Sequence, residues 1–172
     1  TKCGKKRGHR KQKAGWAVIL LWAVGIMILT VRFGEAGKLS VVVLDVGQGD
    51  GIFMKGPKGG TYLVDGGSSD VKKAGQYRLE SFLKSRGVGI IDYVLISHGD
   101  SDHINGVEEL IERQSIGVKI GTLVLPVEEV WDEALAGLAE KAKDYGVRVA
   151  VMEAGQSIRE GKMAVTCIQP GN

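Results

Sequence analysis

The sequence predicts an α/β fold preceded by one transmembrane helix. From residue 39 onward, short apolar runs rich in β-branched residues alternate with amphipathic stretches, which is typical of strands and helices in one layer of a sandwich. The chain has 26 Gly and only 3 Pro in 172 residues, which suits a fold with many tight turns. Residues 14–31, in contrast, carry no charge. The chain is therefore expected to have a membrane part and a globular part.

The uncharged segment 14–31 is long enough to cross most of a bilayer. At about 1.5 Å per residue, a helix of this length nearly spans a hydrocarbon core of roughly 30 Å. Seven Lys and Arg residues precede it, so we expect residues 1–13 to form a basic cytoplasmic segment, and everything after residue 32 to lie on the extracellular side of the cell membrane. A cleavable signal peptide ending near residues 34–36 and a buried core helix are the alternatives.

Charge is distributed unevenly along the chain. Residues 1–32 hold 8 of the 23 Lys and Arg and no acid, which leaves 15 basic residues against 20 acidic ones in the remainder. The basic overall balance therefore belongs to the N-terminal segment. It does not indicate a nucleic-acid surface on the globular part, where phosphate affinity would have to come from metal ions or a local patch.

After a linker at residues 32–38, the globular part begins with a continuous apolar run at residues 39–44. Such a run is typical of a strand that is buried on both faces. Gly and Pro clusters separate the next strands, and amphipathic periodicity marks the helices. In chain order we expect strands at residues 39–44, 52–54, 62–64, 93–96, 123–125, 147–152 and 163–168, and helices at residues 77–86, 105–113 and 130–145.

The strand at residues 93–96 is followed directly by a loop that is dense in potential metal ligands. Two imidazoles and two carboxylates suit zinc or a harder ion such as manganese, and their spacing favours two metal ions. The alternative is an ordinary polar loop, in which the His caps the strand, the Asp residues form turns and Asn105 starts the next helix. The four candidate ligands are His98, Asp100, Asp102 and His103.

Three motifs in this part of the chain resemble the metallo-β-lactamase fold hydrolases. Residues 98–103 (HGDSDH) are similar to the family signature His-x-His-x-Asp-His, with Asp100 in place of the second His. That variant, followed by residues 104–106 (ING), resembles the branch found in ComEC-type competence proteins, which are bacterial DNA-uptake channels. Residues 44–50 (LDVGQGD) and 63–67 (LVDGG) resemble further motifs of the same branch.

The resemblance implies a fold and a set of roles. The fold would be a metallo-β-lactamase-like αββα sandwich, of which residues 39–172 would form only the N-terminal half, so that we expect the chain to be a fragment that is inactive alone. His98 and Asp100 would hold one ion, while Asp102, our candidate catalytic residue, and His103 would hold the other. The carboxylates expected to support them are Asp65, Asp45 and Asp50.

Our leading hypothesis is an extracellular, nuclease-like domain of a ComEC-type DNA-uptake protein, which hydrolyses phosphodiesters with two divalent ions, zinc or manganese. Its partners would be DNA, the membrane and other competence proteins. A second hypothesis keeps the metal but assigns a stand-alone membrane-anchored or secreted hydrolase of a small substrate. A third is a non-catalytic scaffold domain of the uptake machinery, which the replacement of a His by Asp100 would favour.

Overall fold

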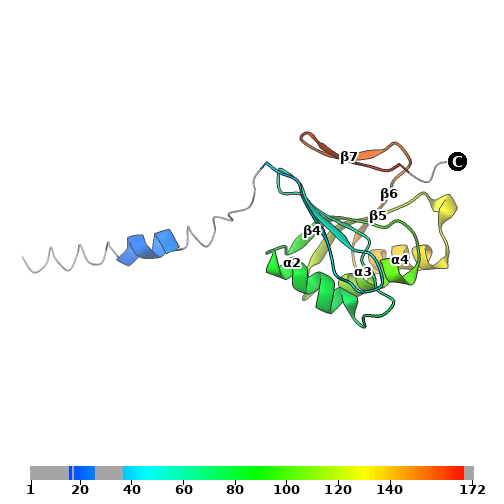
Figure 1. The fold of residues 1–172 in the computed structure, drawn as a ribbon, viewed down its shortest axis with the longest axis horizontal. Helices are drawn as coiled ribbons and strands as arrows, with labels where there is room; N and C mark the ends of the chain where they lie inside the picture. The colour runs from blue at the N-terminus through cyan, green and yellow to red at the C-terminus, as the bar shows by residue number, and fades with distance from the viewer. Residues whose placement is uncertain (1–15, 17, 26–36, 169–172) are drawn as a thin grey trace, which may run out of the picture. The chain divides into compact units, whose positions relative to one another are not determined.

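The computed structural model describes residues 16, 18–25 and 37–168 (Figure 1). The chain divides into two units, Thr1–Glu35 and Ala36–Asn172. Residues 16 and 18–25 are helical, and no helix within the described residues is long and apolar enough to cross a membrane. The predicted span at residues 14–31 extends beyond the described residues at both ends. It stays a prediction, as do the basic segment before it and the linker.

A six-stranded mixed sheet forms the centre of the second unit. Its strands follow one another in chain order across the sheet, with antiparallel pairing from the first to the third strand and parallel pairing from the third to the sixth. They are β1 (Ser40–Val43), β2 (Ile52–Lys55), β3 (Thr61–Val64), β4 (Ile90–Leu95), β5 (Lys119–Leu125) and β6 (Arg148–Val151). The predicted α/β class is confirmed.

Helices cover one side of this sheet, and a separate hairpin lies on the other side (Figure 1). The parallel strands are connected through helices, the usual form of the crossover that parallel pairing requires. The helical elements are the π-helix η1 (Gly75–Glu80), which continues into α2 (Ser81–Ser85), then α3 (Ser101–Arg113), the 3-10 turn η2 (Glu128–Val130) and α4 (Glu133–Asp144). The hairpin consists of β7 (Ser157–Glu160) and β8 (Met163–Thr166).

The two faces of the sheet differ in burial. Leu63, Val94 and Leu123 are neighbours across β3, β4 and β5, and all are 0% exposed within the core that the helices complete. On β1, Val41 and Val43 are 54% and 75% exposed. The expectation that the first strand is buried on both faces was therefore wrong. An apolar run is the same in a central strand and in an edge strand such as β1, so its composition does not distinguish them.

One boundary matters for the site. The helix predicted to begin at Asn105 begins instead at Ser101, because Asp100 has the extended backbone of an N-cap residue. Asp102 and His103 therefore lie in the first turn of α3 and not in a loop. The strand β7 was not predicted, since its sequence, Ser-Ile-Arg-Glu, has little of the apolar alternation that indicates a strand.

The side chain of Glu80, at the junction of η1 and α2, is buried and joins these helices to α3. Its carboxylate accepts a hydrogen bond from Arg113 Nε at 2.8 Å and another from Lys84. Burial acts to raise the pKa of the Glu80 carboxyl, but the hydrogen bonds from Arg113 and Lys84 outweigh it and hold that pKa below its usual value. Sequence analysis did not single out this residue.

We expect Glu80→Gln to lower the free energy of unfolding by about 1–3 kcal/mol at neutral pH, because it weakens charged hydrogen bonds in a buried position. Glu108→Gln is the matched control. Glu108 pairs with Lys141 across α3 and α4, but both side chains are about one-third exposed, so the loss there should stay below about 1 kcal/mol. Urea titration of both variants compares the two losses, and equal losses would contradict the assignment.

The contribution of Glu80 should also depend on pH. Because its folded pKa lies below the ordinary value of 4.5, the stabilisation is present above that value and disappears as pH falls through the folded pKa. The gap in unfolding free energy between the wild type and Glu80→Gln should therefore be constant near neutrality and close only at strongly acidic pH. A gap that closes while pH is still well above 4.5 would show that the pKa is not depressed.

Candidate metal centre

Backbone hydrogen bonds hold three segments together at one edge of the sheet: the loop after β1, the loop after β3 and the start of α3. Asp50 N donates to Asp102 O at 3.2 Å, and Gly66 N donates to His103 O at 2.7 Å. Gly67 N donates to Asp50 O at 3.1 Å. A Cβ at Gly67 would lie 2.5 Å from the carbonyl carbon of Asp102, so this close approach requires glycine. The three predicted motifs thus meet at one place.

Asp65, directly after β3, lies at the centre of this assembly. It is 6% exposed, and its φ of 53° is uncommon for a residue other than glycine. Oδ1 accepts a hydrogen bond from Ser97 N at 2.8 Å, and Oδ2 accepts one from Ser97 Oγ at 2.7 Å. Oδ2 also lies 3.1 Å from His103 Nδ1. An Asp in contact with the Nδ1 of an imidazole can orient that ring. The expected support of a metal site by Asp65 stays a prediction.

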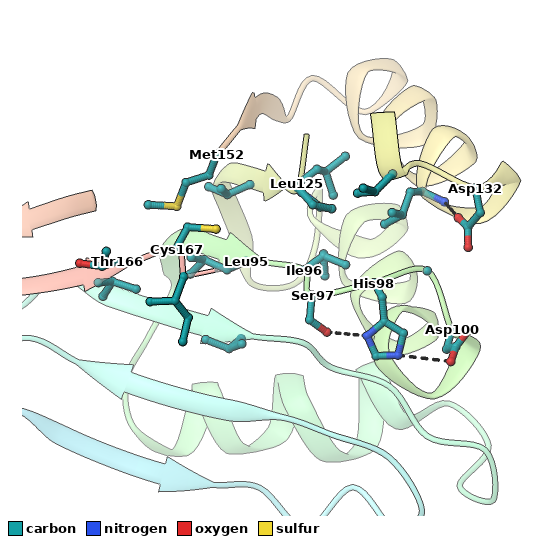
Figure 2. Close-up of a pocket in the computed structure, with 18 residues that line it drawn as sticks. Leu95, Ile96, Ser97, His98, Asp100, Leu125, Asp132, Met152, Thr166 and Cys167 are labelled. Carbon is teal, nitrogen blue, oxygen red and sulfur yellow. Dashed lines mark hydrogen bonds and ion pairs between the residues drawn. The ribbon is translucent and has the colours of Figure 1, made fainter. Parts of the chain in front are cut away.

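The two imidazoles lie next to each other, and each faces a carboxylate. Their ring centroids are 3.9 Å apart. His98 Nε2 is 3.2 Å from Asp100 Oδ2, and His103 Nε2 is 3.6 Å from Asp50 Oδ2. Figure 2 shows His98 between Ser97 on one side and Asp100 on the other. The structure therefore forms two imidazole–carboxylate pairs at one edge of the sheet.

Asp100 occupies the N-cap position of α3 without capping it. Asp is among the best N-cap residues, and loss of such a cap typically costs about 0.5–2 kcal/mol. Here the side chain makes no capping hydrogen bond, and Oδ2 lies beside His98 instead. The N-cap of α4 behaves normally, since Asp132 accepts a hydrogen bond from Leu135 N at 2.8 Å. The Asp100 carboxylate therefore contacts the His98 imidazole in place of the capping hydrogen bond that would stabilise α3.

The chemistry of the two pairs fits divalent cations. When His103 Nδ1 donates to Asp65, the lone pair of a neutral ring is on Nε2, and it faces the acceptor oxygen of Asp50. Two acceptors that face each other repel unless a proton or a cation lies between them. Two ligands of one tetrahedral zinc ion lie about 3.4 Å apart, and the two observed N–O separations, 3.2 Å and 3.6 Å, bracket that spacing. Within the described residues, no three or more His, Cys, Asp or Glu side chains form a group that could hold an ion together. Each imidazole–carboxylate pair would therefore supply two ligands of an ion.

Three predicted site residues, Asp45, Asp102 and Asp50, do not make the contacts that the sequence analysis expected. Asp45 is 85% exposed; its Oδ2 lies 3.5 Å from the Arg78 guanidinium, and no contact within the described residues joins it to either imidazole. The carboxylate of Asp102 makes no hydrogen bond or ion pair in the described part of the chain, so its assignment as ligand and catalytic residue stays a prediction. Asp50, expected only to support the site, instead faces His103 Nε2.

Sequence analysis gave no role in the site to Ser97 or Asp70, and it named Asn105 only as a possible helix start and as part of a motif; Asn105 and Asp70 fix the loop after β3. Asn105 Oδ1 accepts a hydrogen bond from Ser68 N at 3.0 Å, and Asn105 Nδ2 donates to Ser68 O at 2.6 Å. Asp70 Oδ1 accepts from Gln48 N at 2.7 Å, and this backbone hydrogen bond is the main reason why the pKa of Asp70 lies below its usual value. A single polar residue next to a motif has no periodic signal, so only contacts in the fold identify it.

A cavity of about 610 Å³ opens beside His98 and Asp100. Most of its lining is apolar and comes from the carboxyl ends of β4 and β5, from α4 and from the segment after β8 (Figure 2). Leu95, Leu125 and Met152 are among the side chains that line it. The candidate centre therefore lies where a polar edge meets an apolar hollow, which is a common arrangement in small-molecule sites.

Comparison with protein families matches residues 44–164 to the metallo-beta-lactamase superfamily. The chain belongs to this superfamily. Among curated proteins, it is 30% identical over 135 residues to ComE operon protein 3 of Bacillus subtilis (strain 168). The alignment covers 71% of this chain but only 16% of that protein, so the chain spans about one-sixth of its relative. The suspected similarity to a ComEC-type protein is thus confirmed.

Among solved structures, the chain is similar to one described as a new diphosphatase from the PhnP family. The TM-score is 0.45 and the sequence identity is 15%. The superposition covers 75% of this chain and 56% of the other.

Zinc binding should distinguish Asp45 from Asp50, the two aspartates of the loop after β1. We expect Asp50→Asn to weaken zinc binding by about tenfold or more, because Asp50 faces His103 Nε2, whereas Asp45→Asn should leave it unchanged. Isothermal titration of the 172-residue chain and both variants measures the dissociation constants. Any zinc held by the N-terminal segment is common to all three proteins. Equal weakening by the two substitutions would argue against the pairing of Asp50 with His103.

Proposed function

We propose that this chain is part of an extracellular, nuclease-like domain of a ComEC-type DNA-uptake protein, and that the domain hydrolyses phosphodiesters with two divalent ions, zinc or manganese. The observation that carries the proposal is the pair of imidazole–carboxylate contacts at 3.2 Å and 3.6 Å. Both pairs lie within the residues that match the metallo-beta-lactamase superfamily. The sheet would form one layer of the αββα sandwich that the resemblance implies.

The residues present suggest how the centre would work. His98 with Asp100 would hold one ion, and His103 with Asp50 would hold the other, with Asp102 near the second. When bound, the ions would supply Lewis acidity and neutralise charge that develops on phosphate oxygens. Asp65 holds His103 through Nδ1, which keeps Nε2 directed at the centre. The apolar lining of the adjacent cavity would exclude water from one side of the site.

DNA as the substrate is supported by similarity to ComE operon protein 3 and not by the charge of the domain, which has more acids than bases after residue 32. Local features are compatible with a phosphate near the centre. The first turn of α3 begins at Ser101, so its backbone amides lie at this edge of the sheet. Lys72 and Lys73 are exposed and follow the loop after β3. Location outside the cell membrane and contact with other competence proteins are parts of the same proposal.

A second candidate is a hydrolase of a small substrate. It is favoured by the cavity beside His98, whose volume of about 610 Å³ lies in the range of sites for drug-sized ligands. The apolar lining suits an organic substituent better than a polynucleotide backbone, which would need cationic contacts along its length.

Hydrolysis by the full-length gene product tests the proposal. With zinc or manganese added, it should cleave single-stranded DNA and the simple diester bis(p-nitrophenyl) phosphate, and a chelator should abolish both activities until metal is restored. His98→Ala and Asp100→Asn should each reduce the rate at least about a hundredfold, because ligands matter more than the residues behind them. Asp144→Asn is the control, since Asp144 is exposed at the end of α4.

The outcomes separate the candidates. Cleavage of DNA that requires both His98 and Asp100 supports the nuclease. Hydrolysis of small esters or lactams without any cleavage of phosphodiesters would favour the second candidate. A metal-loaded protein without activity on either substrate class would leave the non-catalytic scaffold.

A further inference from the structure

The hydroxyl of Ser97 lies between a buried carboxylate and an imidazole. Ser97 Oγ is 2.7 Å from Asp65 Oδ2 and 2.8 Å from His98 Nδ1. The backbone of the same residue is fixed as well, because Ser97 N donates to Asp65 Oδ1 at 2.8 Å. Ser97 is thus held by both oxygens of Asp65 while its hydroxyl contacts the neighbouring ring.

The number of available protons determines the direction of these hydrogen bonds. A serine hydroxyl has one hydrogen, and an ionised carboxylate can only accept. The contact with Asp65 therefore uses the hydrogen of Ser97. The oxygen of Ser97 is then the acceptor toward His98, and Nδ1 must carry the proton of that ring. The opposite arrangement would place two oxygen acceptors 2.7 Å apart without a hydrogen between them.

We infer that Ser97 is a positioning residue that extends the influence of Asp65 to His98, so that one carboxylate sets the tautomer of both imidazoles. His103 Nδ1 donates a hydrogen bond to Asp65 directly. His98 Nδ1 donates one to the Ser97 hydroxyl, which in turn donates its own hydrogen to Asp65. Both rings then direct an unprotonated Nε2 away from Asp65. His98 Nε2 faces Asp100 and His103 Nε2 faces Asp50, which is where each ring would meet a metal ion.

The surroundings of His98 show why this tautomer needs to be imposed. Without Ser97, a proton on Nε2 could be donated to Asp100 Oδ2, which is only 3.2 Å away. That hydrogen bond would satisfy the carboxylate and occupy the nitrogen that is needed for metal. The Ser97 hydroxyl opposes this arrangement because its oxygen accepts a hydrogen bond from a protonated Nδ1. The role in metal binding depends on the proposed function, but the tautomer itself is a property of the metal-free chain, in which water can hydrate the exposed carboxylates of Asp100 and Asp50 in place of a metal ion.

Nitrogen-15 NMR of the histidine rings tests the inference on the full 172-residue chain without metal, at a pH well above the ordinary histidine pKa of about 6.5. The chain has only 3 His, so few ring signals need assignment. We expect both His98 and His103 to be protonated on Nδ1 in the wild type. In Ser97→Ala, His98 should change to the Nε2-protonated form while His103 keeps its tautomer, and Ser97→Thr should restore the wild-type state of His98.

Ser101→Ala is the matched control, because Ser101 is an exposed serine of the same segment whose hydroxyl contacts Asn105 and neither ring. It should change neither tautomer. Protonation of His98 on Nε2 in the wild type would overturn the inference. This measurement does not depend on whether any variant folds. Persistence of the Nδ1 tautomer in a folded Ser97→Ala would overturn it as well.

Zinc affinity gives a second readout. We expect Ser97→Ala to weaken zinc binding by about 10–100-fold, and Ser97→Thr and Ser101→Ala to bind as the wild type does. Uniform affinity across these variants would argue against a role for the tautomer in metal binding. The predicted tautomers in a protein that hydrolyses nothing would contradict the proposed function alone, whereas hydrolysis with His98 protonated on Nε2 would contradict the role of Ser97 alone.

Discussion

The carboxylate of Asp65 is the group on which the candidate metal centre depends. It is buried at the end of β3. Oδ1 accepts a hydrogen bond from Ser97 N, and Oδ2 accepts one from the Ser97 hydroxyl and contacts His103 Nδ1. A buried carboxylate is costly unless such partners satisfy it. The same contacts that make its burial tolerable also fix the segment on which the imidazoles lie. The positive φ of Asp65 is a local strain that these contacts overcome.

The position of Asp65 follows from the packing of the sheet. Leu63, two residues earlier on β3, is fully buried beside Val94 of β4 in the core that the helices complete. Because β3 and β4 are parallel, their carboxyl ends emerge at the same edge, which brings Asp65 N to Leu95 O at 2.9 Å. Residues that are thirty or more positions apart in the sequence therefore meet because apolar side chains set the register of the two strands. The positions of the polar side chains at this edge of the sheet therefore depend on the packing of buried apolar residues in β3 and β4.

The sequence allowed prediction of the order and class of most elements, because apolar runs and amphipathic stretches report burial directly. The three motifs also meet at one edge of the sheet, where the candidate site lies. It could not show that β1 has an exposed face or that α3 starts at Ser101, since both depend on neighbours in space. The same is true of Glu80, which a helical pattern places on a charged face but which is buried against Arg113. Ser97 was missed because its function depends on Asp65, which lies 32 positions away.

The aspartates of the three motifs show why residue type alone does not assign a role. Asp45 is bound to an arginine at the surface, and Asp65 is buried behind the rings. Asp50 and Asp100 face an Nε2 atom each and remain largely exposed, at 62% and 72%. An exposed carboxylate keeps its charge at little cost, and a charge is what attracts a cation, whereas a buried one orients its neighbours through hydrogen bonds. Among the three aspartates that contact an imidazole, burial therefore separates Asp50 and Asp100, the proposed metal ligands, from Asp65, which orients the rings.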